Sequence, residues 1–162
     1  MLENLPPGRK IFIDSNIFIY HFLDLSDQCT SFLERVHSRE VKGFTSATVL
    51  AEVLHKLMIA EISENYRMNR REVNQFIKRH PNVISELIRC ETAVQMIPEF
   101  NIEILPLMSG VVLESKNLRF EHQLMTNDSV NLYLMKLTGL EDIATNDSDF
   151  NRVPWIQVWR PF

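Results

Sequence analysis

Residues 10–16 read Lys-Ile-Phe-Ile-Asp-Ser-Asn, and this short run is the strongest indication of the fold class. Its β-forming apolar residues, Ile11 to Ile13, predict a short strand that is buried in a sheet. The polar residues Asp14 and Asn16 end that strand, and an amphipathic helix is expected from Ile17 to Leu23. A buried strand that leads directly into a helix is typical of an α/β protein.

The same alternation of strand and helix continues along the chain. Further strands are predicted at residues 43–46, 102–105, 142–145 and 155–159, and further helices at 26–40, 48–64, 69–80, 82–96, 109–122 and 128–138. Ser26, Thr48 and Asn127 are expected to cap helices at their N-termini, and Gly139 is expected to end one. This pattern predicts one domain over residues 1–162, an α/β/α sandwich of three layers around a mainly parallel sheet of about five strands. The helical stretch 62–98 is longer than one crossover requires and is predicted to be an insertion.

Composition excludes several classes of protein. The 162 residues contain 17 Lys and Arg against 21 Asp and Glu, and only two cysteines, so a disulfide scaffold is excluded and a reducing compartment is favoured. With four glycines in the chain, no glycine-rich phosphate loop can be found. No basic segment followed by an apolar one opens the chain, and no apolar run is long enough for a membrane helix, so we expect a cytoplasmic protein.

Acidic residues recur at the predicted carboxyl ends of the strands, where open α/β sheets bind their ligands. They are Asp14, Glu52, Asp128, Asp147 and Asp149. Each Asp alone has a structural explanation as a turn residue or as a partner of a helix dipole. A carboxylate in the apolar helix segment around Glu52 is harder to explain, because its burial is costly unless it is paired or binds a metal.

Clustered carboxylates repel one another, and a hard divalent cation removes that repulsion. Mg²⁺ and Mn²⁺ prefer oxygen ligands, and no Cys or His set in this sequence indicates a softer metal. Sites of this kind with one or two ions are suited to the hydrolysis of phosphodiester bonds. The pattern therefore predicts a metal-dependent nuclease.

Four motifs, in order along residues 11–150, resemble those of the PIN-domain family. They are Ile11-Phe-Ile-Asp14-Ser-Asn16, Ser46-Ala-Thr-Val-Leu-Ala-Glu52, Asn127-Asp128-Ser-Val-Asn-Leu and Ala144-Thr-Asn-Asp147-Ser-Asp149-Phe150. The resemblance implies a Mg²⁺- or Mn²⁺-dependent endoribonuclease, often the VapC-like toxin of a toxin–antitoxin pair. It also implies a homodimer and inhibition by a small antitoxin protein.

The resemblance also assigns roles to individual residues. The catalytic, metal-binding acids would be Asp14, Glu52, Asp128 and Asp147, with Asp149 as an additional metal ligand. The polar residues Asn16, Ser46 and Thr145 would orient these carboxylates or water.

A basic stretch lies within the predicted insertion. It contains Arg67, Arg70, Arg71, Lys78 and Arg79. These side chains would guide RNA phosphates to the acids, or they form only a solvated helix face, and the sequence favours neither. Two alternatives to a toxin also stay open, because the third motif and the long helical stretch depart from the family pattern. One is a PIN-like binding or scaffold module with little or no nuclease activity, and the other is an RNA-processing nuclease without an antitoxin.

Overall fold

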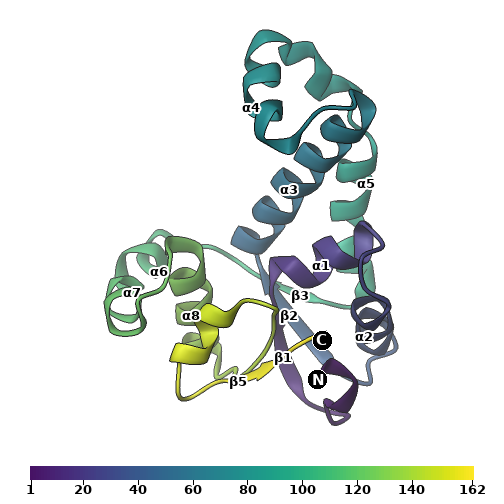
Figure 1. Ribbon diagram of the computed structural model, residues 1–162. Helices are drawn as coiled ribbons and strands as arrows, with labels where there is room; N and C mark the ends of the chain where they lie inside the picture. Colours follow the sequence, from purple (N-terminus) through teal and green to yellow (C-terminus); the bar gives the residue numbers. More distant parts are fainter.

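The computed structural model describes residues 1–162 and contains one five-stranded sheet in which every strand pair is parallel (Figure 1). Its strands are β1 (Lys10–Ile13), β2 (Lys42–Ser46), β3 (Glu103–Leu105), β4 (Asp142–Ala144) and β5 (Gln157–Trp159). The predicted parallel sheet is confirmed. The last strand is shorter than predicted, because residues 155 and 156 precede the pairing with β4.

Helices cover both faces of the sheet, as the three-layer prediction requires. They are α1 (Ser15–Phe22), α2 (Asp27–His37), α3 (Ala47–Asn65), α4 (Arg70–Arg79), α5 (Arg89–Met96), α6 (Ser109–Glu114), α7 (Lys116–His122) and α8 (Thr126–Thr138). Short 3₁₀ helices are η1 (Leu2–Asn4), η2 (Pro81–Glu86), η3 (Ile97–Phe100) and η4 (Ser148–Arg152). In Figure 1, α1 and α2 lie on one side of the sheet and α6 to α8 on the other. None of these helices has the length and apolarity needed to cross a membrane.

The order of the strands creates a switch point at the centre of the sheet. The order is β3-β2-β1-β4-β5, so the chain moves outward from β1 in one direction and then returns to continue in the other. In open α/β sheets the crevice at such a point, beyond the carboxyl ends of the strands, is the usual ligand site. Here the two strands at the switch point are β1 and β4.

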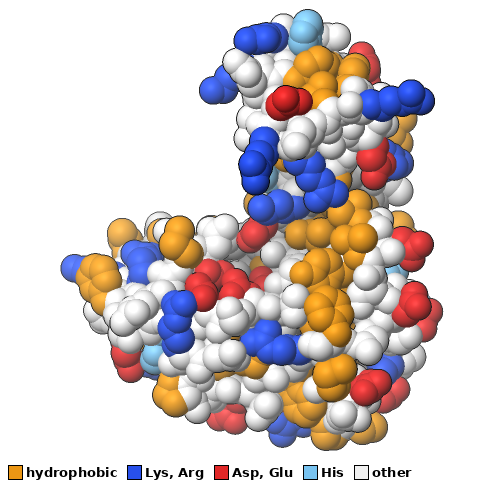
Figure 2. Space-filling model, viewed as in Figure 1, with side chains coloured by type: hydrophobic (Ala, Val, Ile, Leu, Met, Phe, Trp, Pro, Cys, Tyr) orange, Lys and Arg blue, Asp and Glu red, His pale blue; other side chains and the backbone are white.

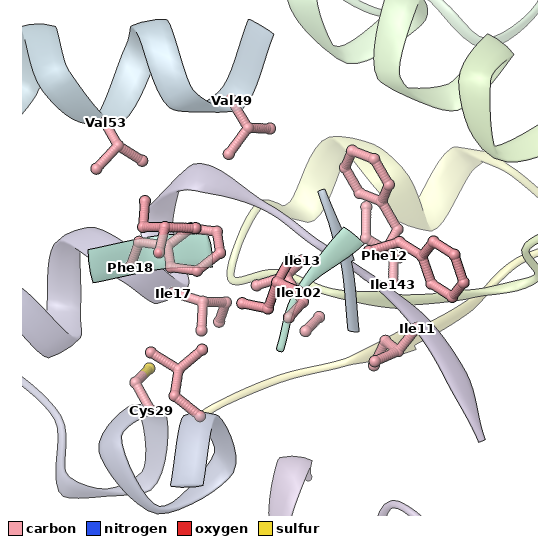
Figure 3. Close-up of a cluster of buried hydrophobic side chains, with 14 of the residues drawn as sticks. Ile11, Phe12, Ile13, Ile17, Phe18, Cys29, Val49, Val53, Ile102 and Ile143 are labelled. Carbon is pink, nitrogen blue, oxygen red and sulfur yellow. The ribbon is translucent and has the colours of Figure 1, made fainter. Parts of the chain in front are cut away.

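The core lies between the sheet and its helices and is built from the apolar residues that predicted the strands. Ile11, Phe12 and Ile13 are fully buried, and Figure 3 shows them among side chains from α1, α2 and α3. Packing leaves no room for a side chain at Gly43, where an added Cβ atom would lie 2.6 Å from Cγ1 of Val36. The absence of a side chain at Gly43 therefore lets β2 approach α2.

A helical arm extends from the sheet, formed by the far half of α3 together with α4, η2 and α5 (Figure 1). The predicted continuous helix 82–96 is wrong, because Leu87 is extended and separates η2 from α5. The buried carboxylate of Glu61 on α3 instead accepts hydrogen bonds from the backbone N–H groups of Ile88, Arg89 and Cys90. These bonds satisfy amides that the start of α5 would otherwise leave unpaired, and they fasten α5 to α3.

Three predicted helix limits also differ from the structure. Ser46, rather than Thr48, caps α3, since its Oγ accepts a hydrogen bond from the backbone N–H of Val49. Asn127 is not a cap, because α8 begins at Thr126 without a side-chain cap. The predicted helix 109–122 is divided into α6 and α7 at Ser115. By contrast, Ser26 caps α2 and Gly139 ends α8 in a left-handed conformation, as predicted.

Candidate functional site

The site is centred on Asp14, which follows β1 and caps α1. Its Oδ1 accepts a hydrogen bond of 2.7 Å from the backbone N–H of Ser15, and its Oδ2 accepts bonds of 2.6 Å from both Asn16 Nδ2 and Thr145 Oγ1. Asn16 also accepts a hydrogen bond from the backbone N–H of Asn146. Thr145 and Asn146 follow β4, so these bonds join the ends of the two strands at the switch point. The predicted contacts of Asn16 and Thr145 with a carboxylate are therefore present.

Asp147 and Asp149 lie in the segment that follows β4. The Oδ1 atom of Asp147 accepts a hydrogen bond of 2.8 Å from the backbone N–H of Asp149 and caps η4. Asp149 is already paired, because its Oδ1 lies 2.5 Å from a guanidinium nitrogen of Arg152. Arg152 also donates a hydrogen bond to the backbone carbonyl of Gln123, between α7 and α8. Asp149 is thus the member of the pair whose charge the protein itself balances.

Asp14, Asp147 and Asp149 follow β1 and β4, and together with Glu52 and Asp128 they are called the acidic corner here. Glu52 lies on α3 and Asp128 on α8, and both side chains are partly buried. Asp128 is the third residue of α8 rather than the first, as the incorrect helix limit had implied. Its place in the first turn is still favourable for a negative charge, because the unpaired amides of a helix N-terminus are electropositive.

Ser46 does not contact a carboxylate, unlike Asn16 and Thr145, so its role in orienting carboxylates or water stays a prediction. Its hydroxyl is turned toward α8 and donates a hydrogen bond of 2.7 Å to Oδ1 of Asn131. Both residues are buried, and their bond joins the start of α3 to α8, the helices that carry Glu52 and Asp128. Asn131 was missed by the sequence analysis. The available signal was its position three residues after Asp128, which places a second polar side chain on the same face of the helix.

Burial and mutual repulsion perturb the acids at this corner. Burial is the main cause that raises the pKa of Asp14 to about 6, and the charges of Glu52 and Asp147 raise it further, against the lowering effect of the hydrogen bonds from Thr145 and Ser15. Burial also raises the pKa of Asp128 to about 6, followed in effect by the charges of Asp14, Asp147, Glu52 and Asp149. Asp128 therefore lies within electrostatic range of the other four predicted acids.

The donor set fits a hydrated divalent cation better than an ion enclosed by protein ligands. All the acidic donors are carboxylate oxygens, which suit Mg²⁺ and Mn²⁺. No group of three or more Asp, Glu, His or Cys side chains is close enough in this structure to ligate one ion together. Mg²⁺ commonly keeps several water ligands and binds to only one or two carboxylates directly, so this spacing is compatible with it.

Basic side chains lie close to the acidic corner. In Figure 2, Lys and Arg side chains cover the lower part of the arm, directly above a cluster of Asp and Glu side chains in the recess between the arm and the lobe formed by α6 and α7. All five basic residues singled out in the sequence are exposed. Arg67 lies between α3 and α4, Arg70 and Arg71 are in the first turn of α4, and Lys78 and Arg79 are in its last turn.

Comparisons with known proteins give matches over most of the chain. The PIN domain profile matches residues 11–156. Ribonuclease VapC2 of Methanocaldococcus jannaschii is 30% identical over 150 residues, which are 93% of this chain and 93% of that protein. The match thus extends over all four motifs and the arm.

Solved structures show a similar fold. VapC20 of Mycobacterium tuberculosis, described as a toxin that cleaves the sarcin–ricin loop, superposes with a TM-score of 0.59 at 13% identity over 90% of this chain and 96% of that one. A toxin–antitoxin complex from Klebsiella pneumoniae gives 0.57 at 19% identity, covering 94% and 98%. VapBC2 of Rickettsia felis, bound to a DNA fragment from its promoter, gives 0.56 at 17% identity, covering 93% and 98%.

Proposed function

The chain belongs to the PIN-domain family, and from this membership we propose that it is a ribonuclease that hydrolyses phosphodiester bonds of RNA with Mg²⁺ or Mn²⁺ at the acidic corner. The observation that carries the proposal is the convergence of five carboxylates at the switch point, where the pKa values of Asp14 and Asp128 are both raised to about 6. An RNA phosphate cannot approach so many negative charges unless a cation offsets them.

We propose that Asp14, Glu52, Asp128 and Asp147 hold the cation, directly or through its water ligands. A bound divalent ion supplies Lewis-acid stabilisation of the phosphoryl oxygens and lowers the pKa of a water molecule. The carboxylate of Asp14 is held in one orientation, because both of its oxygens accept hydrogen bonds, from Ser15, Asn16 and Thr145.

Two further groups complete the proposed site. Asp149 binds Arg152 through Oδ1, which leaves Oδ2 as its contribution to the set of metal ligands. The hydroxyl of Thr145 connects the residues that follow β1 and β4, since it donates a hydrogen bond to Asp14 and accepts one from the backbone N–H of Asp147. The side chain of Thr145 thereby sets the spacing of two acids that come from different strands.

The test is cleavage of a fluorescently labelled RNA oligonucleotide by the purified protein. We expect cleavage in Mg²⁺ or Mn²⁺, none in EDTA, and loss of at least a hundredfold in rate for Asp14→Asn with an unchanged circular dichroism spectrum. Glu91→Gln is the matched control, because Glu91 is an exposed acid on α5 outside the cluster. Equal activity of Asp14→Asn and Glu91→Gln would exclude the acidic corner as the catalytic site.

A second candidate is a PIN-like binding or scaffold module without catalysis. It is favoured by the spacing of the acids, because no three of them are close enough together to ligate one ion. Calorimetric titration with Mn²⁺ discriminates the two functions. A folded protein that binds no Mn²⁺ at millimolar concentration supports the module, and binding that is lost in Asp14→Asn supports the nuclease.

We further propose that the protein acts in the cytoplasm, as a homodimer, with a small antitoxin protein as its partner. The antitoxin is suggested by two structural neighbours, which are described as VapBC2 and as a toxin–antitoxin complex. A small reading frame beside the gene, whose product binds this protein and stops RNA cleavage, is the expected finding. If no such neighbour exists and the protein still cleaves RNA, an RNA-processing role without an antitoxin is favoured.

A further inference from the structure

A groove beside the acidic corner has no part in the site described above. It lies between α1, α3 and α4 and has a volume of about 290 Å³. Its lining is Ile19, Leu23, His55, Lys56, Ile59, Arg70 and Asn74. Of these seven residues only Arg70 belongs to the basic stretch recognised in the sequence.

The groove adjoins the acids through α3. Lys56 follows Glu52 by four residues, so the two side chains share a face of the helix and their Cα atoms are about 6 Å apart along its axis. Oppositely charged residues at this spacing commonly pair. Here they do not, and neither Lys56 nor Arg70 forms an ion pair with any other residue of the chain. Both cations are therefore exposed and without an ion-pair partner, and Lys56 lies one helical turn from Glu52.

The chemistry of the groove suits a nucleotide rather than a bare anion. Lys56, Arg70, His55 and Asn74 offer hydrogen-bond donors for phosphate oxygens, and Arg70 stands in the first turn of α4, where the helix dipole also favours an anion. Ile19, Leu23 and Ile59 supply an apolar wall, which can cover the face of a base or a ribose.

We propose that this groove is a nucleotide subsite of the ribonuclease, in which Lys56 and Arg70 hold a phosphate that flanks the scissile one. The inference rests on the proposed function and adds to it a role for the arm. The arm brings α4 over α3, so that Arg70 faces Lys56 across the groove and the RNA strand is led from the groove to the acids.

Binding without cleavage is the first test. The affinity for a labelled single-stranded RNA oligonucleotide is measured by fluorescence anisotropy in EDTA for the wild-type protein and for the double variant Lys56→Ala/Arg70→Ala. The matched control is Lys10→Ala/Lys136→Ala, which removes two exposed charges at the start of β1 and the end of α8, at the opposite edge of the sheet. Melting temperatures verify that all three proteins are folded.

We expect the groove variant to bind RNA at least fivefold more weakly at low salt, and the control to bind within twofold of the wild type. The slope of log K against log salt concentration should flatten by about 0.7 for each phosphate contact that is lost. Equal weakening in both double variants would show a nonspecific effect of net charge and overturn the subsite. Unchanged binding in the groove variant would also overturn it, and would leave an acidic peptide segment as the occupant that these cations fit.

A second test locates the phosphate. A single uncharged methylphosphonate linkage is moved through the positions that flank the cleavage site, and KM is measured in Mg²⁺ or Mn²⁺. In the wild type one position should raise KM severalfold, and the same position should have no effect in the groove variant. An identical penalty in both proteins would refute the assignment. Absence of RNA cleavage by the wild type would contradict the proposed function. Cleavage of RNA without any effect of the groove variant would contradict only the nucleotide subsite.

Discussion

Replacing Asp14 by Asn should destabilise the metal-free protein in acid but cost little or no stability at pH 8, although it removes the proposed activity. Burial raises the pKa of Asp14 to about 6, from an ordinary value of 3.8. This difference of about two pKa units corresponds to roughly 3 kcal/mol of free energy, at about 1.4 kcal/mol per unit. In the absence of a cation, this is the approximate free energy by which the ionised carboxylate disfavours the folded state at pH 8.

The pH dependence of this effect has a definite sign. Because the folded protein holds the proton of Asp14 more tightly than the unfolded chain does, wild-type stability decreases as the pH rises from about 4 to about 6, and it levels off above that range. The variant lacks the group. The free energy of unfolding of Asp14→Asn minus that of the wild type should therefore increase by about 2–3 kcal/mol between pH 4 and pH 8.

Hydrogen bonding gives the variant a penalty that does not depend on pH. Its amide nitrogen replaces Oδ2, which accepts bonds from both Asn16 and Thr145. Thr145 can accept instead of donating, but the two amide groups would oppose each other, at a cost of about 1–3 kcal/mol. The difference in stability should consequently begin negative at pH 4 and approach or exceed zero at pH 8.

Urea denaturation in EDTA at several pH values measures this difference directly. Contributions from carboxylates remote from Asp14 are common to both proteins and cancel, whereas Asp128, whose pKa is raised in part by the charge of Asp14, adds a change of the same sign. Added Mn²⁺ should stabilise the wild type and leave the variant unchanged, since only ligands that bind the folded state raise stability. A stability difference that is the same at pH 4 and pH 8 would refute the reasoning, because it would show that the carboxylate is not held in a disfavoured ionised state.

Two other changes test the supports of the site and of the arm. Thr145→Val removes a hydrogen bond that lowers the pKa of Asp14, so the titration midpoint of the Asp14 carboxyl in ¹³C NMR should move upward from about 6, and a downward movement would contradict the assigned contact. Glu61→Gln should lower the free energy of unfolding by about 2 kcal/mol at pH 7, because the ionised carboxylate accepts three backbone hydrogen bonds at the start of α5. Although burial opposes its ionisation, the amides of Cys90, Arg89 and Ile88 hold the pKa of Glu61 below its usual value of 4.5. The loss of stability in Glu61→Gln should therefore shrink as the pH falls below 4.5. A loss that stays unchanged in acid would contradict the assigned role of the ionised carboxylate.

Local sequence pattern was sufficient to predict the fold and the position of the acids. Three consecutive apolar β-forming residues before Asp14 favour a strand covered on both faces, and parallel strands bring the residues that follow them to one edge of the sheet. The five acids follow from this rule, because each lies just beyond a strand or in the first turns of a helix beside one. Asn16 and Thr145 could be predicted for the same reason, since they lie within three residues of the ends of strands β1 and β4.

The contacts between helices and loops could be decided only by the tertiary structure. Ser46 and Thr48 are both plausible caps in sequence. In the structure Ser46 is the cap, and its hydroxyl also donates a hydrogen bond to Asn131, which lies 85 positions further on in α8. Likewise, the pairing of Asp149 with Arg152 depends on the local turn of η4, and the position of Arg70 opposite Lys56 depends on how the arm packs. The repeating spacing of apolar residues encodes which face of an element is buried, whereas a polar contact between distant segments depends on distances of a few tenths of an ångström that no local pattern specifies.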